Sequence, residues 1–306
     1  MESKNIKSSS SREYVVGLGE ALWDCLPTGK QLGGAPANFA YHVSQFGIPS
    51  YVASAVGKDE LGEKALELFS EKKLNCIIPQ IDYPTGTVQV TLTGNGIPQY
   101  EIKQGVAWDN ISFTPEMEKL SKKTRAVSFG SLAQRNDVSR STIMKFLGAM
   151  PERSDVLKIF DINLRQNFYT REIIETSLLI CNILKINDEE LSVIEKLISV
   201  PAMDLREVCF ALIEKYGLKM LILTCGTNGS YVFTSDAMTF LKTPVVAVED
   251  TVGAGDAFSA AFCAGILCGM EPFEAHKLAV KTSAYVCTCK GAMPELPDEI
   301  RKATHP

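Results

Sequence analysis

The chain has 306 residues, of which 45% are hydrophobic and 22% are charged. This composition is typical of a globular protein with a large core, so the chain is not expected to be disordered. The formal net charge is −5 and no long basic block occurs, which argues against a groove that follows nucleic-acid phosphates. No run of about 18 apolar residues is present, so no membrane span is expected.

Further limits on the function come from the N-terminus, the histidines and the cysteines. Residues 1–12 are polar and serine-rich without the apolar core of a signal peptide, and we expect a flexible tail there. The three histidines have no metal-ligand spacing, so a zinc site is not expected. Nine cysteines, mostly inside apolar segments, indicate reduced, buried thiols of a cytoplasmic protein. Examples are Cys209, Cys225, Cys263 and Cys268.

Short apolar runs alternate with helical patterns along the chain. A strand that enters a turn is expected over Tyr14–Gly19, and a helix follows over Ala35–Phe46. This alternation predicts an α/β fold in which a doubly wound, mainly parallel sheet is covered on both faces. Further strands are expected at Tyr51–Val56, Ala126–Phe129, Leu157–Ile162, Ile183–Ile186 and Met220–Leu223, and a further helix at Leu61–Lys73.

One segment departs from this alternation. Residues Thr85–Thr93 alternate in polarity, a turn follows at Gly94-Asn95-Gly96, and Gln99–Ile102 returns. Asn-Gly between two such runs predicts a β-hairpin. The pattern leaves open whether the hairpin lies at the edge of the main sheet or forms a flap over a site.

The segment Asp250-Thr-Val-Gly-Ala-Gly-Asp256 carries the most specific chemical signal. A strand-like run, Val245–Val248, precedes it, and an apolar helix of small residues, Ala257–Leu267, follows. The Gly-Ala-Gly turn therefore lies at a helix N-terminus, where unpaired backbone N–H groups and the helix dipole attract an anion. Asp256 lies in the first helical turn. An acid there is either a helix cap or the acceptor of a proton from a hydroxyl that attacks a bound phosphoryl group.

A second glycine-rich segment, Gly33-Gly34-Ala-Pro36-Ala-Asn38, also enters a helix. Proline is favoured in the first turn of a helix. Asn38 then lies near the helix start, where its amide can hydrogen-bond a neutral ligand. The alternative interpretation is a tight loop with a structural asparagine.

Together the two segments resemble the signature regions of the ribokinase-like (PfkB) sugar kinases, and GGAPANFAYHVSQFG is most similar to the fructokinase branch. The resemblance extends from Gly19 to Pro294. It implies one kinase domain over residues 13–306, with a doubly wound α/β core and a small β lid from about residues 22–34 and 84–112. It also implies transfer of the ATP γ-phosphoryl group to a sugar hydroxyl.

The resemblance assigns roles to individual residues. It makes Asp256 the catalytic base and lets the N–H groups of Gly253, Ala254 and Gly255 hold the transferring phosphoryl group. Arg165, within Asp161-Ile-Asn-Leu-Arg165, would bind a sugar or phosphoryl oxygen, and its alternative is an ion pair, for example with Asp161. The sugar contacts that the resemblance implies, besides Asp256 and Arg165, are Asp24, Gly33, Gly34, Asn38 and Gln89.

The nucleotide side is assigned in the same way. The resemblance implies contacts with ATP from Asn187, Thr224, Gly226, Gly229 and Gly255. Asn187 and Glu190 would act on Mg²⁺ through water, and Asp250 would help to bind a monovalent cation such as K⁺. The alternative interpretation is that Glu190 is a solvated acid at the start of a helix. Likewise, residues 224–229 would form only a hairpin turn.

The function expected from the sequence is an ATP-dependent fructokinase that forms fructose 6-phosphate. The alternatives are a ribokinase, a 2-keto-3-deoxygluconate kinase, a nucleoside kinase, or a sugar-responsive binding protein without catalysis. A phosphorylated acceptor would want more basic residues than Lys103 and Arg165. Neither nucleic acid nor a membrane is expected as a partner. A homodimer through the lid is expected, because lid edges of this kind can pair.

Overall fold

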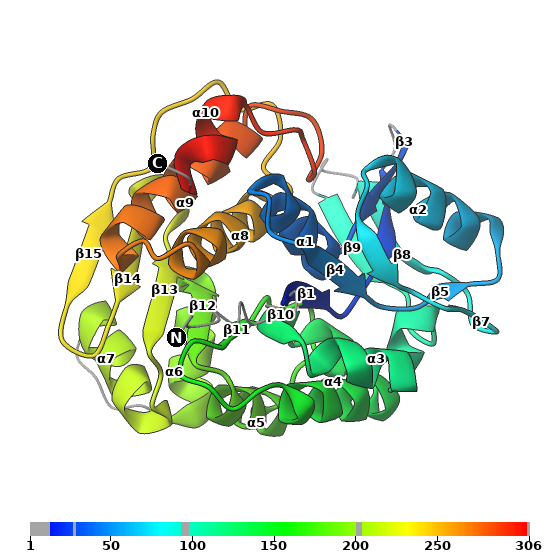
Figure 1. Cartoon of the computed structure of the whole chain (residues 1–306), viewed down its shortest axis with the longest axis horizontal. Helices are drawn as coiled ribbons and strands as arrows, with labels where there is room; N and C mark the ends of the chain where they lie inside the picture. Colours follow the sequence, from blue (N-terminus) through cyan, green and yellow to red (C-terminus); the bar gives the residue numbers. More distant parts are fainter. Residues whose placement is uncertain (1–12, 27–28, 93–97, 200–203, 305–306) are drawn as a thin grey trace, which may run out of the picture.

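A nine-stranded sheet forms the centre of the protein (Figure 1). The structure is a computed structural model that describes residues 13–26, 29–92, 98–199 and 204–304. The strand order is β15-β14-β13-β12-β11-β10-β1-β4-β6, and neighbours are parallel except at β14 and β15. The strands are β1 (Tyr14–Leu18), β4 (Ser50–Ala53), β6 (Asn75–Ile77), β10 (Thr124–Gly130), β11 (Leu157–Asp161), β12 (Ile183–Asn187), β13 (Met220–Thr224), β14 (Ser230–Phe233) and β15 (Met238–Leu241). The predicted α/β sheet is therefore confirmed.

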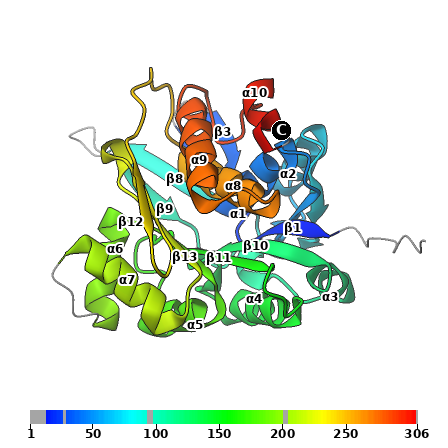
Figure 2. The same ribbon diagram turned by 60° about the vertical axis from the view of Figure 1, so that its left-hand side comes forward.

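Helices cover both faces of this sheet, as Figures 1 and 2 show. Because strand side chains alternate between the two faces, Val15 packs in one core with Phe39 and Phe262, whereas Val16 packs in the other core with Phe146. One face carries α1 (Ala35–Gln45), α8 (Ala254–Leu267), α9 (Pro272–Val286) and α10 (Asp298–Arg301). The other carries α3 (Pro115–Ser121), α4 (Asp137–Ala149), α5 (Arg171–Ile180), α6 (Asp188–Ile198) and α7 (Leu205–Tyr216).

A separate four-stranded sheet lies at one side of the central sheet (Figure 1). Its order is β3-β2-β8-β9, from β2 (Leu22–Leu26), β3 (Gly29–Gly33), β8 (Gly86–Leu92) and β9 (Pro98–Ile102). The predicted hairpin is thus confirmed as β8 and β9, and it does not join the edge of the main sheet. Its expected turn lies outside the described residues. Helix α2 (Glu60–Glu71) is tied to the small sheet, since Trp23 Nε1 donates to the Leu61 carbonyl over 3.0 Å.

Helix α8 is buried along most of its length. Its alanines and glycines let neighbouring helices approach closely, so that a Cβ atom at Gly265 would lie 3.0 Å from the Cβ of Ala275 in α9. A helix that is apolar on all sides is stable only when it is covered on all sides. Helices α1 and α9 and the sheet provide this cover, which holds the N-terminus of α8 in a fixed place.

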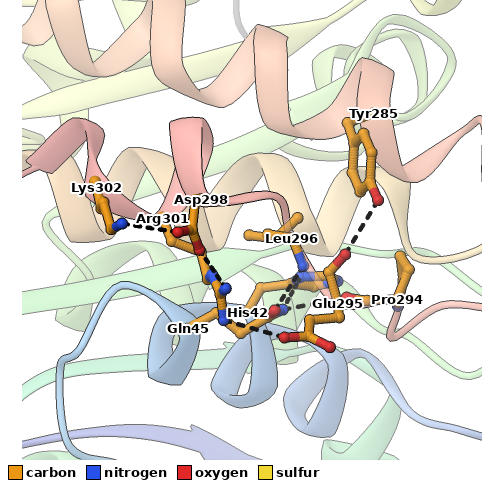
Figure 3. Close-up of polar contacts among 9 residues, drawn as sticks. All are labelled: His42, Gln45, Tyr285, Pro294, Glu295, Leu296, Asp298, Arg301 and Lys302. Carbon is orange, nitrogen blue, oxygen red and sulfur yellow. Dashed lines mark hydrogen bonds and ion pairs between the residues drawn. The ribbon is translucent and has the colours of Figure 1, made fainter.

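The segment after α9 is fastened to α1 by polar contacts, most of which Figure 3 shows. Gln45 donates from Nε2 to the Pro294 carbonyl (3.2 Å) and accepts the Leu296 N–H (2.7 Å). His42 Nε2 lies 2.9 Å from the Ala292 carbonyl and donates to it. Beyond these, Arg301 pairs with Glu295 and Asp298. These contacts hold Ala292 beside the loop that precedes α8.

Two expectations from the sequence were wrong. The run Val245–Val248 is not a strand, because no neighbouring strand pairs with it, and Val245 is fully exposed. Cys268 is exposed because it follows the last residue of α8, whereas Cys209, Cys225 and Cys263 are buried. All nine cysteines are free thiols. The predicted tail over residues 1–12 lies outside the described residues. Within those residues, none of the helices is long and apolar enough for a membrane span.

Candidate active site

The candidate site lies at the carboxyl ends of the parallel strands, where α1 and α8 begin. Ligands of open α/β sheets bind at this edge, because the loops and helix N-termini converge there. Five segments contribute charged or amide side chains to it. They are Glu20 after β1, Asn38 in α1, Asp161 and Lys185 in β11 and β12, and Asp256 in α8.

The N-terminus of α8 offers unpaired backbone donors, as the Gly-Ala-Gly turn predicts. Gly253 precedes the helix with φ of 77°, in the left-handed region, and no side chain caps this end. The N–H of Ala254 donates to the Thr251 carbonyl over 3.3 Å. Among the described residues, the N–H groups of Gly253 and Gly255 have no acceptor. Of the three predicted donors, Gly253 and Gly255 are thus free to bind an anion beside the helix dipole, whereas Ala254 has a backbone acceptor; the anion hole itself stays a prediction.

Asp256 is held by a hydrogen bond from a distant part of the chain. Asn38 Nδ2 donates to Asp256 Oδ2 over 2.8 Å. Burial and the charge of Asp161 raise the pKa of Asp256 to about 6, while the Asn38 hydrogen bond, Lys185 and Arg165 oppose this rise. A carboxylate with a pKa near the working pH is suited to accept a proton in a reaction.

Asn38, the predicted sugar contact, has one side of its amide engaged within the protein, and its contact with a sugar stays a prediction. Nδ2 is engaged with Asp256, and Oδ1 is buried without a partner among the described residues. The amide thus orients Asp256. Neighbouring Gly34 has φ of 115°, and a Cβ there would lie 2.3 Å from the Glu20 carbonyl oxygen, so only glycine fits where the loop meets β1.

Lys185 is a site residue that the sequence analysis missed. Its Nζ lies 3.0 Å from Asp161 Oδ1, and both side chains are about nine-tenths buried. Nζ also lies 3.2 Å from the place where a Cβ at Gly255 would be. Burial lowers the pKa of Lys185, but Asp161, Glu190 and Asp256 raise it further, so the ammonium stays charged. A lysine inside the apolar run of a buried strand was the available signal.

Asp161 is paired with Lys185, so Arg165 is not its ion-pair partner. It lies in the exposed loop after β11, and its Nη1 donates to the Leu164 carbonyl over 2.9 Å. Its charge nevertheless lowers the pKa of Glu20, Asp24 and Asp256, which places it at the rim of the site.

The small sheet presents Asp24 but not Gln89 to the site. Asp24 pairs in register with Val88 and Gln31, so these three side chains share one face. Gln89 pairs with Cys25 and points to the opposite face, because side chains alternate along a strand. The predicted sugar contact at Gln89 is thus wrong. Asp24 Oδ2 lies 2.7 Å from where a Cβ at Gly33 would be, so the glycine makes room for the carboxylate.

Asn187 and Glu190 form the capping box of α6. Asn187 Oδ1 accepts the Glu190 N–H (2.8 Å), and Glu190 accepts the N–H of Asn187 (3.0 Å) and of Leu164 (2.8 Å) on its two carboxylate oxygens. Glu190 is only 6% exposed. Both side chains are thus engaged with backbone N–H groups, and their predicted action on Mg²⁺ through water stays a prediction.

Asp250 and the turn at Thr224–Gly229 also have local structural partners. Asp250 Oδ1 accepts the Val252 N–H and Oδ2 accepts the Gly291 N–H, so both oxygens of the predicted cation ligand hold the loop before α8. Thr224 ends β13, and the turn through Gly226 and Gly229 joins it to antiparallel β14. A hairpin turn is thus present there, at the same edge of the sheet as Asp256.

Comparison with known proteins identifies the family. A model of the pfkB family of carbohydrate kinases matches residues 18–299. The chain belongs to this family. An ATP-dependent 6-phosphofructokinase of Thermoanaerobacterium thermosaccharolyticum is 29% identical over 93% of this chain and 91% of its own length. Fructokinase-1 of Zea mays is 25% identical over 95% and 97%.

Solved structures agree with this pfkB kinase assignment. An uncharacterized sugar kinase of Pyrococcus horikoshii is 26% identical, with a TM-score of 0.78 over 95% of this chain and 99% of that one. A fructokinase of Vibrio cholerae shares the fold, at 23% identity and a TM-score of 0.77 over 96% and 99%. The ribokinase-like fold expected from the two signature segments is therefore confirmed.

The close approach of Gly253 to Ala292 generates a stability prediction. A Cβ at Gly253 would lie 2.6 Å from the Cβ of Ala292, in addition to the left-handed φ. We expect Gly253→Ala to destabilise the protein by about 3 kcal/mol in urea unfolding, from backbone strain and overpacking together. Gly269 also has a left-handed φ, 87°, but no atom near its Cβ position, so Gly269→Ala is the matched control and should cost only about 1–2 kcal/mol. Equal losses would show that Ala292 does not press on Gly253.

Proposed function

We propose that this pfkB kinase is a fructokinase, which transfers the γ-phosphoryl group of ATP to a hydroxyl of fructose and forms fructose 6-phosphate. Membership of the family makes the protein a phosphotransferase with a hydroxyl acceptor and implies ATP and a divalent cation. The P. horikoshii sugar kinase has been solved in complex with ATP. Relatives named as fructokinases, from maize and Arabidopsis, support fructose as the acceptor at 25–28% identity.

The step itself requires a base and stabilisation of phosphoryl charge. Asp256 takes the proton from the attacking sugar hydroxyl, and the oxygen of this hydroxyl forms a bond to the γ-phosphorus. The bond between the γ-phosphorus and the β,γ-bridging oxygen breaks, which releases ADP. The N–H groups of Gly253 and Gly255 and the ammonium of Lys185 would face the negative oxygens of the transferring group. Phosphoryl transfer depends mainly on such positioning and charge stabilisation.

The charges around the acceptor position favour a neutral sugar over a sugar phosphate. Glu20, Asp24 and Asp256 all lie within electrostatic reach of Arg165, which is the cation they share. Asp24 is largely buried, and burial raises its pKa, while Arg165 lowers it. The carboxylates of Asp24 and Asp256, when ionised, would repel an acceptor that carries a phosphate dianion. This observation carries the choice of fructose over fructose 6-phosphate, the acceptor of the 6-phosphofructokinase relative.

A coupled assay of ADP release tests the acceptor. We expect the highest kcat/KM with fructose among fructose, fructose 6-phosphate, ribose, glucose, 2-keto-3-deoxygluconate and adenosine, in the presence of ATP and Mg²⁺. A higher kcat/KM with another acceptor would contradict fructose as the substrate but would still support a kinase. Calorimetric binding of a sugar without any ADP release would instead support a binding protein.

Removal of the proposed base should affect turnover more than sugar binding. We expect Asp256→Asn to lower kcat by roughly 10²- to 10⁴-fold, because the amide cannot accept the hydroxyl proton. The sugar dissociation constant and the unfolding midpoint should remain close to those of the wild type. Asp137→Asn, at an exposed acid in the first turn of α4, is the control. Near-normal turnover of Asp256→Asn would exclude the role as base.

The raised pKa of Asp256 predicts how activity depends on pH. Since only the ionised carboxylate can accept a proton, kcat/KM should fall tenfold per pH unit below the pKa of about 6. The phosphates of ATP also titrate in this range, so a variant is needed to assign the change. Asn38→Ala removes a hydrogen bond that lowers the pKa of Asp256, and should shift the acid limb to higher pH. If the acid side of the pH profile does not shift in Asn38→Ala, the loss of activity at low pH belongs to another titrating group.

A further inference from the structure

Two oxygen atoms at the start of α1 have no hydrogen-bond partner among the described residues. They are Oε2 of Glu20 and Oδ1 of Asn38, and each of the two residues is only 3% exposed. Both atoms are acceptors when Glu20 is ionised. Buried acceptors without a donor are costly and rare, so each of these two oxygens requires an explanation.

The two side chains lie against the same helical turn. Glu20 lies beside Gly34, the N-cap residue of α1, because a Cβ at Gly34 would be 2.3 Å from the Glu20 carbonyl oxygen. Asn38 lies one turn later, and its own N–H donates to the Gly34 carbonyl over 3.1 Å. Because helical side chains lean toward the N-terminus, the Asn38 amide covers the turn that Ala35 begins.

We propose that Glu20 is a positioning residue whose carboxyl group carries a proton in the active enzyme and donates it in a hydrogen bond to Oδ1 of Asn38. A single proton then satisfies both unpartnered oxygens. The Asn38 amide becomes fixed with Nδ2 toward Asp256, since the flipped amide would place an oxygen against a carboxylate. Asp256 keeps Oδ1 for the acceptor hydroxyl. This role rests on the proposed kinase function.

The charges that face Glu20 agree with a neutral carboxyl group. The charged groups around it are Asp256, from α8, and Arg165, from the loop after β11. Burial is the largest influence and raises the pKa of Glu20 to about 7, Asp256 raises it too, and Arg165 and two backbone hydrogen bonds oppose them. A second negative charge this close to Asp256 would also make Asp256 harder to ionise.

Two replacements of Glu20 separate the donor from the shape of the side chain. In Glu20→Gln the amide N–H₂ can donate to Oδ1 of Asn38 in place of the carboxyl proton, so kcat should remain of the same order as in the wild type. Glu20→Met has a similar shape but no donor, and kcat should fall about 10²-fold because Asp256 is no longer oriented. Tyr216→Phe removes another buried, unpartnered polar atom, far away in α7, and should leave kcat unchanged. Equal activity of the Gln and Met variants would overturn the proposal.

The pH dependence distinguishes a protonated carboxyl group from a merely structural one. Above the pKa of about 7 the wild type loses its donor, whereas Gln keeps its own, so the ratio of wild-type kcat/KM to that of Glu20→Gln should fall with rising pH. A ratio that does not change with pH would overturn the proposal, and this readout remains usable if Glu20→Met does not fold.

Thermal unfolding tests the proton without reference to activity. A carboxyl group whose pKa is raised in the folded state loses stability as pH rises from its ordinary pKa to the raised one. Glu20→Gln lacks this loss. The unfolding midpoint of the variant should therefore rise relative to that of the wild type between about pH 5 and about pH 8. A constant difference would show that Glu20 is ionised throughout. If the wild type phosphorylates no sugar, the kinase proposal fails, but this measurement still decides the protonation of Glu20.

Discussion

The hydrogen bond between Asn38 and Asp256 is the contact on which the candidate site depends. The two residues are 218 positions apart, and each lies in the first turns of a helix that begins at the carboxyl edge of the sheet. Because α1 packs beside α8, the amide of one helix orients the carboxylate of the other. The unpaired N–H groups of Gly253 and Gly255 then lie beside that carboxylate. One helix pair thereby brings the proposed base beside the unpaired backbone donors.

The burial of charge around this contact gives each ionisable group a distinct state. Lys185 remains charged because Asp161 pairs with it, and burial together with the charge of Asp161 raises the pKa of Asp256 to about 6. The fold supports these states from outside the site. The segment after α9 is fastened to α1 through His42 and Gln45, and it holds Ala292 against Gly253. A catalytic geometry of this kind needs rigid surroundings, since small displacements are costly for phosphoryl transfer.

The small sheet illustrates how register decides which residues meet a ligand. The alternating sequence of the hairpin indicates two strands, but not which strand lies beside them. Only the pairing of β8 with β2 shows that Val88 shares a face with Asp24 and that Gln89 does not. A shift of one residue would exchange the two faces, so a glutamine in the correct strand was assigned to the wrong side.

The amino-acid sequence by itself determined the family, the alternation of strands and helices, and the turn at the start of α8. These depend on local chemistry, since glycine permits the left-handed backbone at residue 253 and the small apolar residues of α8 require burial. The tertiary structure alone decided the partners of the buried polar groups. It pairs Lys185 with Asp161, leaves Val245–Val248 outside the sheet, commits Glu190 to a helix cap, and brings Glu20 to the first turn of α1. Hydrogen bonds and ion pairs act over about 3 Å, and residues far apart in sequence come within that distance only once the chain has packed.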